Sequence, residues 1–442
     1  MKIWSLFLLQ VLFCLCLSTQ GFHNSENINS QQHRGLRSAE GKESDQDSSP
    51  DFGFSEEIEV IGPSVFPKPS DVAKTSVSDD IVVAIKPRLG EHHPEKDAII
   101  AFASEYPVKN YVVFIRSLRE NGYTGDIVLS VSEIDLKDSE TKAFLESDPA
   151  VVVYVPEIIC FNAEREAVGS IKGGSRTCST HHLFGRRQAN GTVTPLLDPR
   201  SPRTVANTRY EIYWTMVVNY NPDSWILVVD ARDTVFQSNP FADVPRTTDP
   251  TKKSGLLYFF GENANATRIG KSKFNTKWIT NAYGEVVAQH LKDKPIICSG
   301  ASMGEQVAME AYVRALVNEG DETGTVLTGS DQGFHNRLYY SRKLAGAHQI
   351  HAIVVFDQGT GVVNNMGALR DSPLESWGNG KILHEIIDGN SKRYEIRNWD
   401  GTKRCVFQTP SSNFLSFCFI VSNLTHFTLA APLYINTIGT RF

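Results

Sequence analysis

Segments typical of buried strands alternate with segments typical of helices early in the chain. The strand-like segments cover residues 97–103, 126–131 and 151–155. Between them, one helix-like segment has its apolar residues on one face between Pro107 and Gly122, and a second covers residues 139–146. Strands that are joined through helices usually pair in parallel. The alternation therefore predicts a mostly parallel α/β sheet flanked by helices.

The same kind of pattern resumes further along the chain. Residues 157–203 show no sustained periodicity, which predicts a long surface insertion. A helix over residues 205–220 then leads to a strand at 225–229, which ends at Asp230. A turn of small residues at 300–304 is expected before a helix over 305–317. Further strands are expected at 255–260, 295–299 and 350–356.

The two ends of the chain differ from this central part. Residues 3–17 form a nearly uncharged apolar run, which is shorter than the about 20 residues that span a membrane and fits a secretory signal. Residues 1–18 are therefore interpreted as a signal peptide or a signal anchor. Residues 19–80 contain few apolar side chains, so we expect a disordered stem. The predicted folded domain covers 81–408, and 409–442 is a hydrophobic tail of unknown role.

With either kind of targeting segment, the rest of the chain enters the secretory pathway. Sequons at Asn190, Asn265 and Asn423 fit a lumenal surface. In an oxidising lumen Cys160 and Cys178 would close a short loop, although a sequence alone does not determine cysteine pairing. We expect a single-pass type II membrane protein of the Golgi or endoplasmic reticulum, or a secreted protein if the segment is cleaved.

Composition excludes several classes of protein. The chain has 41% hydrophobic and 21% charged residues, a balance typical of globular proteins rather than of disordered or polytopic membrane proteins. Its formal net charge is −6. An acidic chain lacks the overall positive charge that binding to a phosphate backbone requires. We therefore expect no nucleic-acid partner.

Acidic residues stand at the end of the strand in WILVVDARDTVFQSNPF. Asp230, Arg232 and Asp233 follow the apolar run, and ligands of open α/β sheets bind at the carboxyl ends of strands. Two carboxylates there suit a divalent cation that takes its remaining ligands from a diphosphate. The alternative is a loop in which Arg232 pairs with an aspartate and Asp233 caps a turn.

Five motifs occur in a fixed order along the chain, namely FIRSLRENGYTGDIVLSV, TRYEIYW, VVDARDTVFQSNPF, ICSGASMG and SDQGFHN. Together they resemble the GT-A fold glycosyltransferases, the nucleotide-diphospho-sugar transferases, particularly their plant and algal members. The resemblance covers about residues 97–367. The resemblance implies a single large catalytic domain with a GT-A (Rossmann-like) sheet. It also implies transfer of a hexosyl or pentosyl group from a nucleotide-diphosphate sugar to a hydroxyl of a glycan or glycoprotein.

The resemblance also implies roles for individual residues. Asp230 and Asp233 would stand in for the DxD element that holds Mn²⁺ or Mg²⁺, here in a D-x-R-D variant with two residues between the carboxylates. Asp331 and Gln332 would border the reacting centre and are the candidate catalytic residues. The donor is expected to meet Ala103, Ser104, Arg209, Ser299 and Gly300.

Two alternative functions remain open on the sequence. In many members of the family a later histidine-containing segment closes over the diphosphate, whereas the corresponding NWDGTKRCVFQ has no histidine. That difference leaves open a non-catalytic lumenal carbohydrate-binding or scaffold protein. VVDARDTVF also resembles the DxDxT motif of haloacid-dehalogenase-type phosphohydrolases, but Arg232 occupies the position of its second aspartate.

Overall fold

The computed structural model describes the central part of the chain. The described residues are 81–172, 177–246, 255–265, 267–366, 383–388, 391–402 and 406–408. The expected targeting segment, stem and tail (1–18, 19–80 and 409–442) lie outside them, so these predictions and the domain bounds stay predictions. Within the described residues, no helix combines the length and the apolar character needed to cross a membrane.

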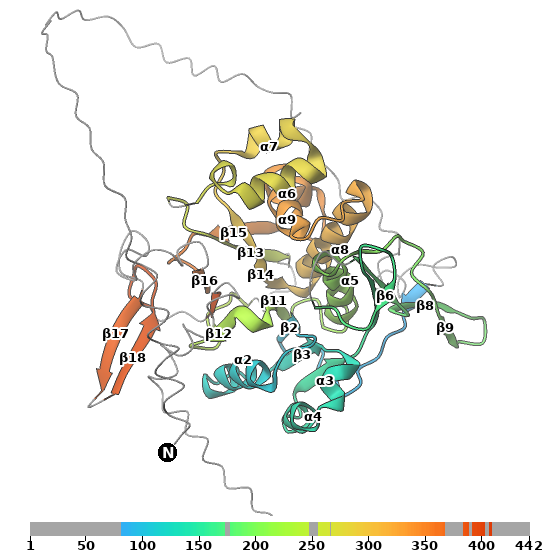
Figure 1. Ribbon diagram of the computed structural model, residues 1–442. Coiled ribbons are helices and arrows are strands. Elements are labelled where there is room, and N and C mark those ends of the chain that lie inside the picture. The colour runs from blue at the N-terminus through green and yellow to red at the C-terminus, as the bar shows by residue number, and fades with distance from the viewer. Residues whose placement is uncertain are drawn as a thin grey trace, which may run out of the picture. The chain divides into compact units, whose positions relative to one another are not determined.

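A seven-stranded sheet forms the centre of the fold, with the order β15-β13-β14-β11-β2-β3-β4 (Figure 1). Neighbouring strands pair in parallel except at β14, which is antiparallel to both β11 and β13. The predicted mostly parallel sheet is therefore confirmed. The strands are β2 (Ala98–Phe102), β3 (Asp126–Ser130), β4 (Val151–Tyr154), β11 (Trp225–Asp230), β13 (Leu256–Gly261), β14 (Ile297–Glu305) and β15 (Ala352–Phe356).

Helices cover both faces of this sheet. Successive side chains of a strand point to opposite faces, so Ile99 lies in a core with Phe114 of α2, while Ile100 lies in a second core with Trp214 of α5 and Tyr312 of α8. Two buried faces explain why the strands read as continuous apolar runs. The helices are α2 (Val108–Glu120), α3 (Glu133–Lys137), α4 (Ser139–Glu146), α5 (Val205–Val217), α6 (Lys273–Tyr283), α7 (Glu285–Leu291), α8 (Gln306–Thr323) and α9 (Ser330–Tyr340).

The predicted small-residue turn at 300–304 is wrong, because β14 continues through it to Glu305. The glycine there serves close strand packing instead of a turn. A Cβ atom on Gly304 would lie 2.5 Å from the carbonyl oxygen of Leu256 in the neighbouring strand. Small residues therefore let β14 fit between β11 and β13, and the helix that was expected from residue 305 begins at Gln306.

The segment predicted as a surface insertion, 157–203, forms short strands outside the central sheet. A four-stranded sheet has the order β10-β7-β5-β6, and a three-stranded sheet has the order β1-β8-β9. Strands of two to five residues are too short to produce a visible periodicity. Their bounds are β1 (Ile81–Val83), β5 (Glu157–Phe161), β6 (Ala167–Val168), β7 (Thr177–His181), β8 (Phe184–Arg187), β9 (Val193–Pro195) and β10 (Arg203–Thr204).

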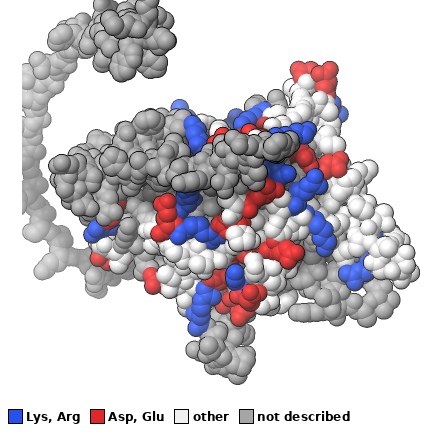
Figure 2. Space-filling model, turned by 90° about the horizontal axis from the view of Figure 1, so that it is seen from below, with Lys and Arg blue, Asp and Glu red and all other residues white. Residues whose placement is uncertain are grey.

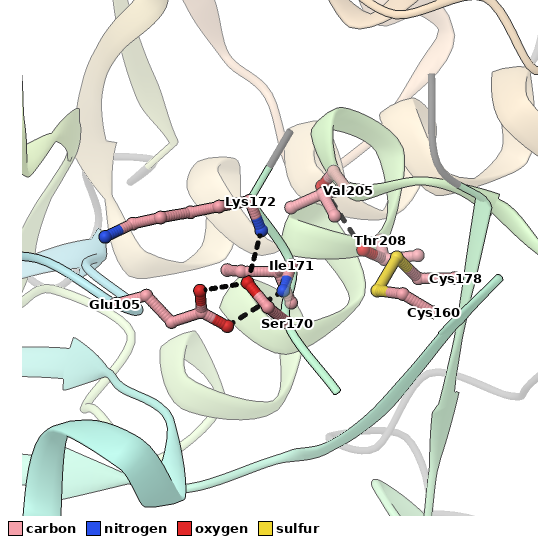
Figure 3. Close-up of a disulfide and its surroundings, with 8 residues drawn as sticks. All are labelled: Glu105, Cys160, Ser170, Ile171, Lys172, Cys178, Val205 and Thr208. Atoms are coloured by element: carbon pink, nitrogen blue, oxygen red, sulfur yellow. Dashed lines mark hydrogen bonds between the residues drawn. A yellow bond between two sulfur atoms is a disulfide. The ribbon is translucent and has the colours of Figure 1, made fainter. Parts of the chain in front are cut away.

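Two features hold these small sheets together. Cys160 of β5 lies directly opposite Cys178 of β7, and the two form a disulfide (Figure 3). Beside them, two buried arginines pair with two buried carboxylates, and Arg200 also lies 3.4 Å from the carboxylate of Asp321. The four residues are Arg200, Arg203, Asp198 and Glu211. The pairing of Cys160 with Cys178, which the sequence left open, is therefore formed.

The chain beyond Asp233 contributes smaller elements around the sheet. Strand β12 (Thr234–Phe236) pairs with β19 (Val406–Gln408), which also pairs with β16 (Val363–Asn365). The last strand therefore lies beside the segment that directly follows the acidic motif. The remaining elements are the hairpin β17 (Leu383–Asp388) and β18 (Ser391–Ile396), and the short 3-10 helices η1 (Ala231–Asp233), η2 (Ile269–Lys271) and η3 (Lys343–Gly346).

Candidate functional site

The direction of the strands brings the predicted site residues to one edge of the sheet. Strands β2, β11 and β13 end at this edge, whereas the antiparallel β14 begins there. Phe102 pairs with Asp230, the last residue of β11, so Ala103 lies one position beyond the end of both strands. Because β14 begins at Ile297, Ser299 and Gly300 lie near its start. The motifs that contain these residues therefore meet along this one edge of the sheet, which we call the border.

Arg209 joins the end of β11 to the start of α9. From helix α5, its Nη1 donates to Asp230 Oδ1, and its Nη2 donates to Asp331 Oδ2 at 2.6 Å. The arginine side chain is only 15% exposed and that of Asp331 only 5%. Burial disfavours the charge of Arg209, but Asp230, Tyr210 and Asp331 outweigh burial and raise its pKa well above the ordinary value. Arg209 therefore acts as a fixed positive charge between two carboxylates.

Helix α9 is held against β14 by its first turn. The backbone N–H of Ser299 donates to Gln332 Oε1 at 2.7 Å, and Gln332 Nε2 donates to the carbonyl oxygen of Ile297 at 2.5 Å. The Ser299 hydroxyl lies 3.5 Å from Asp331 Oδ2, to which it donates. Burial raises the pKa of Asp331, and Arg209 opposes that effect. The structure thus brings Arg209, Asp230, Ser299, Asp331 and Gln332 into one connected network.

Asp233 lies apart from this network, in the short helix η1. Its carboxylate accepts a hydrogen bond from Arg232 Nε at 3.1 Å, and the side chain of Asp233 is 16% exposed. Burial raises the pKa of Asp233 to about 6, although Arg232 lowers it. Arg232 itself lies over the ring of Tyr106, 5.9 Å from its centroid. The pairing of Arg232 with Asp233 that the sequence left as an alternative is present.

The donor set of Asp230 and Asp233 fits a divalent cation of the predicted kind. Among the described residues no group of three or more His, Cys, Asp or Glu side chains would hold a metal. Mg²⁺ is nevertheless commonly held by one or two carboxylates together with substrate phosphates. Arg209 contacts only Oδ1 of Asp230, which leaves Oδ2 as a ligand atom. The partner of Asp233, Arg232, is 43% exposed and therefore displaceable.

Ala103 and Ser104 lie at the border, but both are buried inside the protein. The Ser104 hydroxyl donates to the carbonyl oxygen of Ser130 at 3.3 Å. The next residue, Glu105, has a left-handed backbone with φ of 61° and accepts hydrogen bonds from Ser170 Oγ and the N–H of Ile171 (Figure 3). The disulfide-closed segment is therefore tied directly to the end of β2.

Sequence reasoning missed two ionisable residues at this border. Tyr106 follows β2 and faces Arg232, and burial raises the pKa of its hydroxyl to about 12. Glu262 follows β13, and burial raises the pKa of its carboxyl to about 7. The rule that selected Asp230, an acidic residue directly after a buried strand, applies equally to Glu262 in GLLYFFGEN.

Comparisons with known proteins give remote similarities. No family model matches the chain, and no curated protein matches it. Similar solved structures include the galactosyltransferase LgtC in complex with donor and acceptor sugar analogs, at 10% identity over 71% of this chain and 87% of LgtC, with a TM-score of 0.33. An active-site mutant of LgtC is 11% identical over 58% of this chain and 72% of LgtC, with a TM-score of 0.28.

A third similar structure is the apo-form glycosyltransferase GlyE of Streptococcus pneumoniae. It is 11% identical, and the alignment covers 56% of this chain and 44% of GlyE with a TM-score of 0.28. TM-scores of this size establish neither a shared family nor a shared site.

Proposed function

We propose that the protein is a glycosyltransferase that moves a hexosyl or pentosyl group from a nucleotide-diphosphate sugar to a hydroxyl of a glycan or glycoprotein. The observation that carries the proposal is the bridge formed by Arg209. It connects Asp230 of the VVDARD motif with Asp331 of the SDQG motif. Arg209 itself belongs to TRYEIYW, so three of the segments that resemble the GT-A transferases meet at the carboxyl edge of the sheet.

Asp230 and Asp233 would hold Mn²⁺ or Mg²⁺, which when bound neutralises charge on the leaving diphosphate. Arg209 holds the carboxylates of Asp230 and Asp331 in fixed positions. Asp331 would serve as a general base only if the reaction inverts the configuration of the sugar. Both polar ends of Gln332 bind the backbone of β14. We therefore assign Gln332 a positioning role.

The proposed compartment is the lumen of the Golgi or endoplasmic reticulum, reached as a type II membrane protein or, after cleavage, as a secreted protein. The apolar run at residues 3–17 supports this proposal. The disulfide between Cys160 and Cys178 is consistent with it, because such bonds persist in oxidising compartments.

The alternative candidate is a non-catalytic carbohydrate-binding protein. Each of the three acidic site residues already pairs with an arginine, since Arg209 binds Asp230 and Asp331 while Arg232 binds Asp233. A cation must displace Arg232 or share Asp230 with Arg209. The two candidates differ in whether a metal and a nucleotide diphosphate bind together.

Calorimetric titration of the full-length chain tests the proposal. Uridine and guanosine diphosphates are titrated with Mn²⁺ present and again after chelation, using the native protein, Asp233→Ala and the control Asp223→Ala. Asp223 is an exposed aspartate in the turn before β11. We expect binding of one nucleotide that requires Mn²⁺, disappears in Asp233→Ala and persists in the control. No binding of either nucleotide by the folded native protein would favour the non-catalytic candidate.

A further inference from the structure

Helix α6 packs beside α9 (Figure 1). An open groove runs along α6. It consists of two adjoining hollows of about 520 and 300 Å³. Both are bordered by Gly270, Thr276 and Glu285, so they form one continuous depression between α6, η2 and the start of α7. The size of this depression is that of sites for small ligands, which range from about 300 to 1,000 Å³.

The groove is positively charged although the chain as a whole is acidic. Five basic residues line it against two acidic ones, Glu285 and Asp293, which leaves three net positive charges. Within the part of the chain that the structure describes, none of the five forms an ion pair with a carboxylate. The five residues are Arg268, Lys271, Lys273, Lys277 and Lys292. By contrast, the face shown in Figure 2 carries acidic and basic side chains next to one another.

An aromatic pair, exposed Phe274 and partly buried Trp278, lies at the side of this groove. Phe274 is 65% exposed and stacks on Trp278 one turn later, with ring centroids 5.8 Å apart and ring planes at 30°. Successive residues of a helix are separated by about 100°. Phe274 and Trp278 therefore lie between the groove-facing Lys273 and Lys277 on one side and the buried Ile279 on the other.

The aromatic pair also borders the start of helix α9. A Cβ atom on Gly329, the residue that precedes α9, would lie 2.3 Å from the ring of Trp278. Gly333 packs against the same tryptophan, with its Cβ position 3.3 Å from Trp278. Asp331 belongs to this first turn. Asp331 follows Gly329 by two residues, about 200° around the helix, so it lies on the side of α9 opposite to the aromatic pair. The groove and the aromatic pair therefore lie next to each other on α6.

We propose that the α6 groove binds the acceptor, and that this acceptor is an oligosaccharide with negatively charged groups. The inference rests on the proposed sugar transfer. An aromatic face suits the C–H-bearing side of a sugar ring, because both surfaces are apolar. The basic side chains attract carboxylate or sulfate groups. The groove thus fits an acidic glycan chain.

Binding experiments on the full-length chain, without any donor, test this inference. The probes are an oligogalacturonide, a sulfated oligosaccharide of similar length and a neutral oligosaccharide, with an acidic peptide as a further probe. Biolayer interferometry measures each affinity at about 0.1 M and about 1 M salt, because more salt shortens the distance over which charges attract one another. We expect an acidic glycan to bind more tightly than the neutral one and to weaken at high salt.

Matched variants locate the binding surface. Lys273→Glu with Lys277→Glu should weaken acidic-glycan binding about tenfold or more, whereas Lys137→Glu with Lys142→Glu makes the same charge change on α3 and α4 and should leave it unchanged. Phe274→Ala should weaken binding severalfold, and Phe274→Tyr should retain it.

Equal affinity of native protein and both double variants would refute the inference, and so would tighter binding of the acidic peptide than of either acidic glycan. The difference between carboxylated and sulfated probes identifies the charged group. Because this assay contains no nucleotide, a native protein that binds nucleotide but no acidic glycan would remove the inference and leave the proposed function standing.

Discussion

Removal of the Arg209 guanidinium should leave two carboxylates without a compensating charge. Asp331 is the more sensitive partner, since its side chain is 5% exposed compared with 34% for Asp230. Two charges about 4 Å apart interact by about 4 kcal/mol at the effective dielectric constant of about 20 that reproduces most measurements. Desolvation offsets part of this gain. We therefore expect Arg209→Met to lower the free energy of unfolding by about 3 to 5 kcal/mol.

A double-mutant cycle separates the ion pair from other effects of the substitution. Asp331→Asn should cost less than Arg209→Met, because Arg209 keeps Asp230 as a partner. Combining the two changes removes the unpaired carboxylate as well as the arginine. We expect the double variant to be less destabilised than the sum of the single variants, with a coupling energy of about 2 kcal/mol.

Urea denaturation followed by tryptophan fluorescence measures these free energies, and a surface ion pair provides the comparison. Lys142 Nζ lies 3.7 Å from Glu146 Oε1 one turn away on α4, and both side chains are about half exposed. Their cycle should give about 0.3 to 0.5 kcal/mol. A coupling of that size for Arg209 and Asp331 would refute the assignment of Arg209 as the buried connection between the two motifs.

Three further predictions concern the surroundings of the site. Gly329→Ala should destabilise the protein by about 2 to 4 kcal/mol, because Gly329 has a φ of +87° and its Cβ would collide with an indole ring. Gly324→Ala in the same loop, with a φ of +59° and open space, should cost only about 1 kcal/mol; equal losses in urea denaturation would contradict this packing. Replacing Cys160 and Cys178 together by serine should cost about 3 kcal/mol, as expected for a separation of 18 residues, and an unchanged midpoint would argue against a formed disulfide. Burial raises the pKa of Glu262 from 4.5 to about 7, so its contribution to stability is complete below pH 4.5 and is lost as the pH rises through about 7. Glu262→Gln should therefore gain about 2 kcal/mol relative to the native protein between pH 5 and pH 8, and a pH-independent difference would refute a buried carboxyl there.

The sequence predicts the sheet well where strands are long and buried on both faces. The apolar run from Trp225 to Asp230 produced a strand with nearly the predicted bounds, and so did residues 151–155. Strands of two to five residues between 157 and 203 remained hidden, because a periodic pattern needs more positions. Helices α6 and α7 were missed entirely, although α6 has a serine N-cap at Ser272.

The candidate site could be predicted only as separate motifs. Asp230 was recognisable because it follows a buried strand, and Asp331 because it lies in the resemblant motif SDQGFHN. Nothing local indicated that Arg209 would bind both, since the contact with Asp331 joins residues 122 positions apart. The pKa shifts of Asp233 and Glu262 likewise depend on burial, which arises from packing between distant segments.

Turnover of sugar nucleotides tests the central claim most directly. Release of nucleoside diphosphate from a panel of nucleotide sugars is measured for the full-length chain with Mn²⁺ and an acidic oligosaccharide, beside Asp331→Asn and the exposed-site control Asp223→Asn. The proposed function predicts release from one donor together with a mass increase of one sugar on the acceptor. The control should retain this activity, and Asp331→Asn should lower it at least about tenfold. If the folded protein released no nucleoside diphosphate from any donor and transferred no sugar to any acceptor, the claim of sugar transfer would be contradicted.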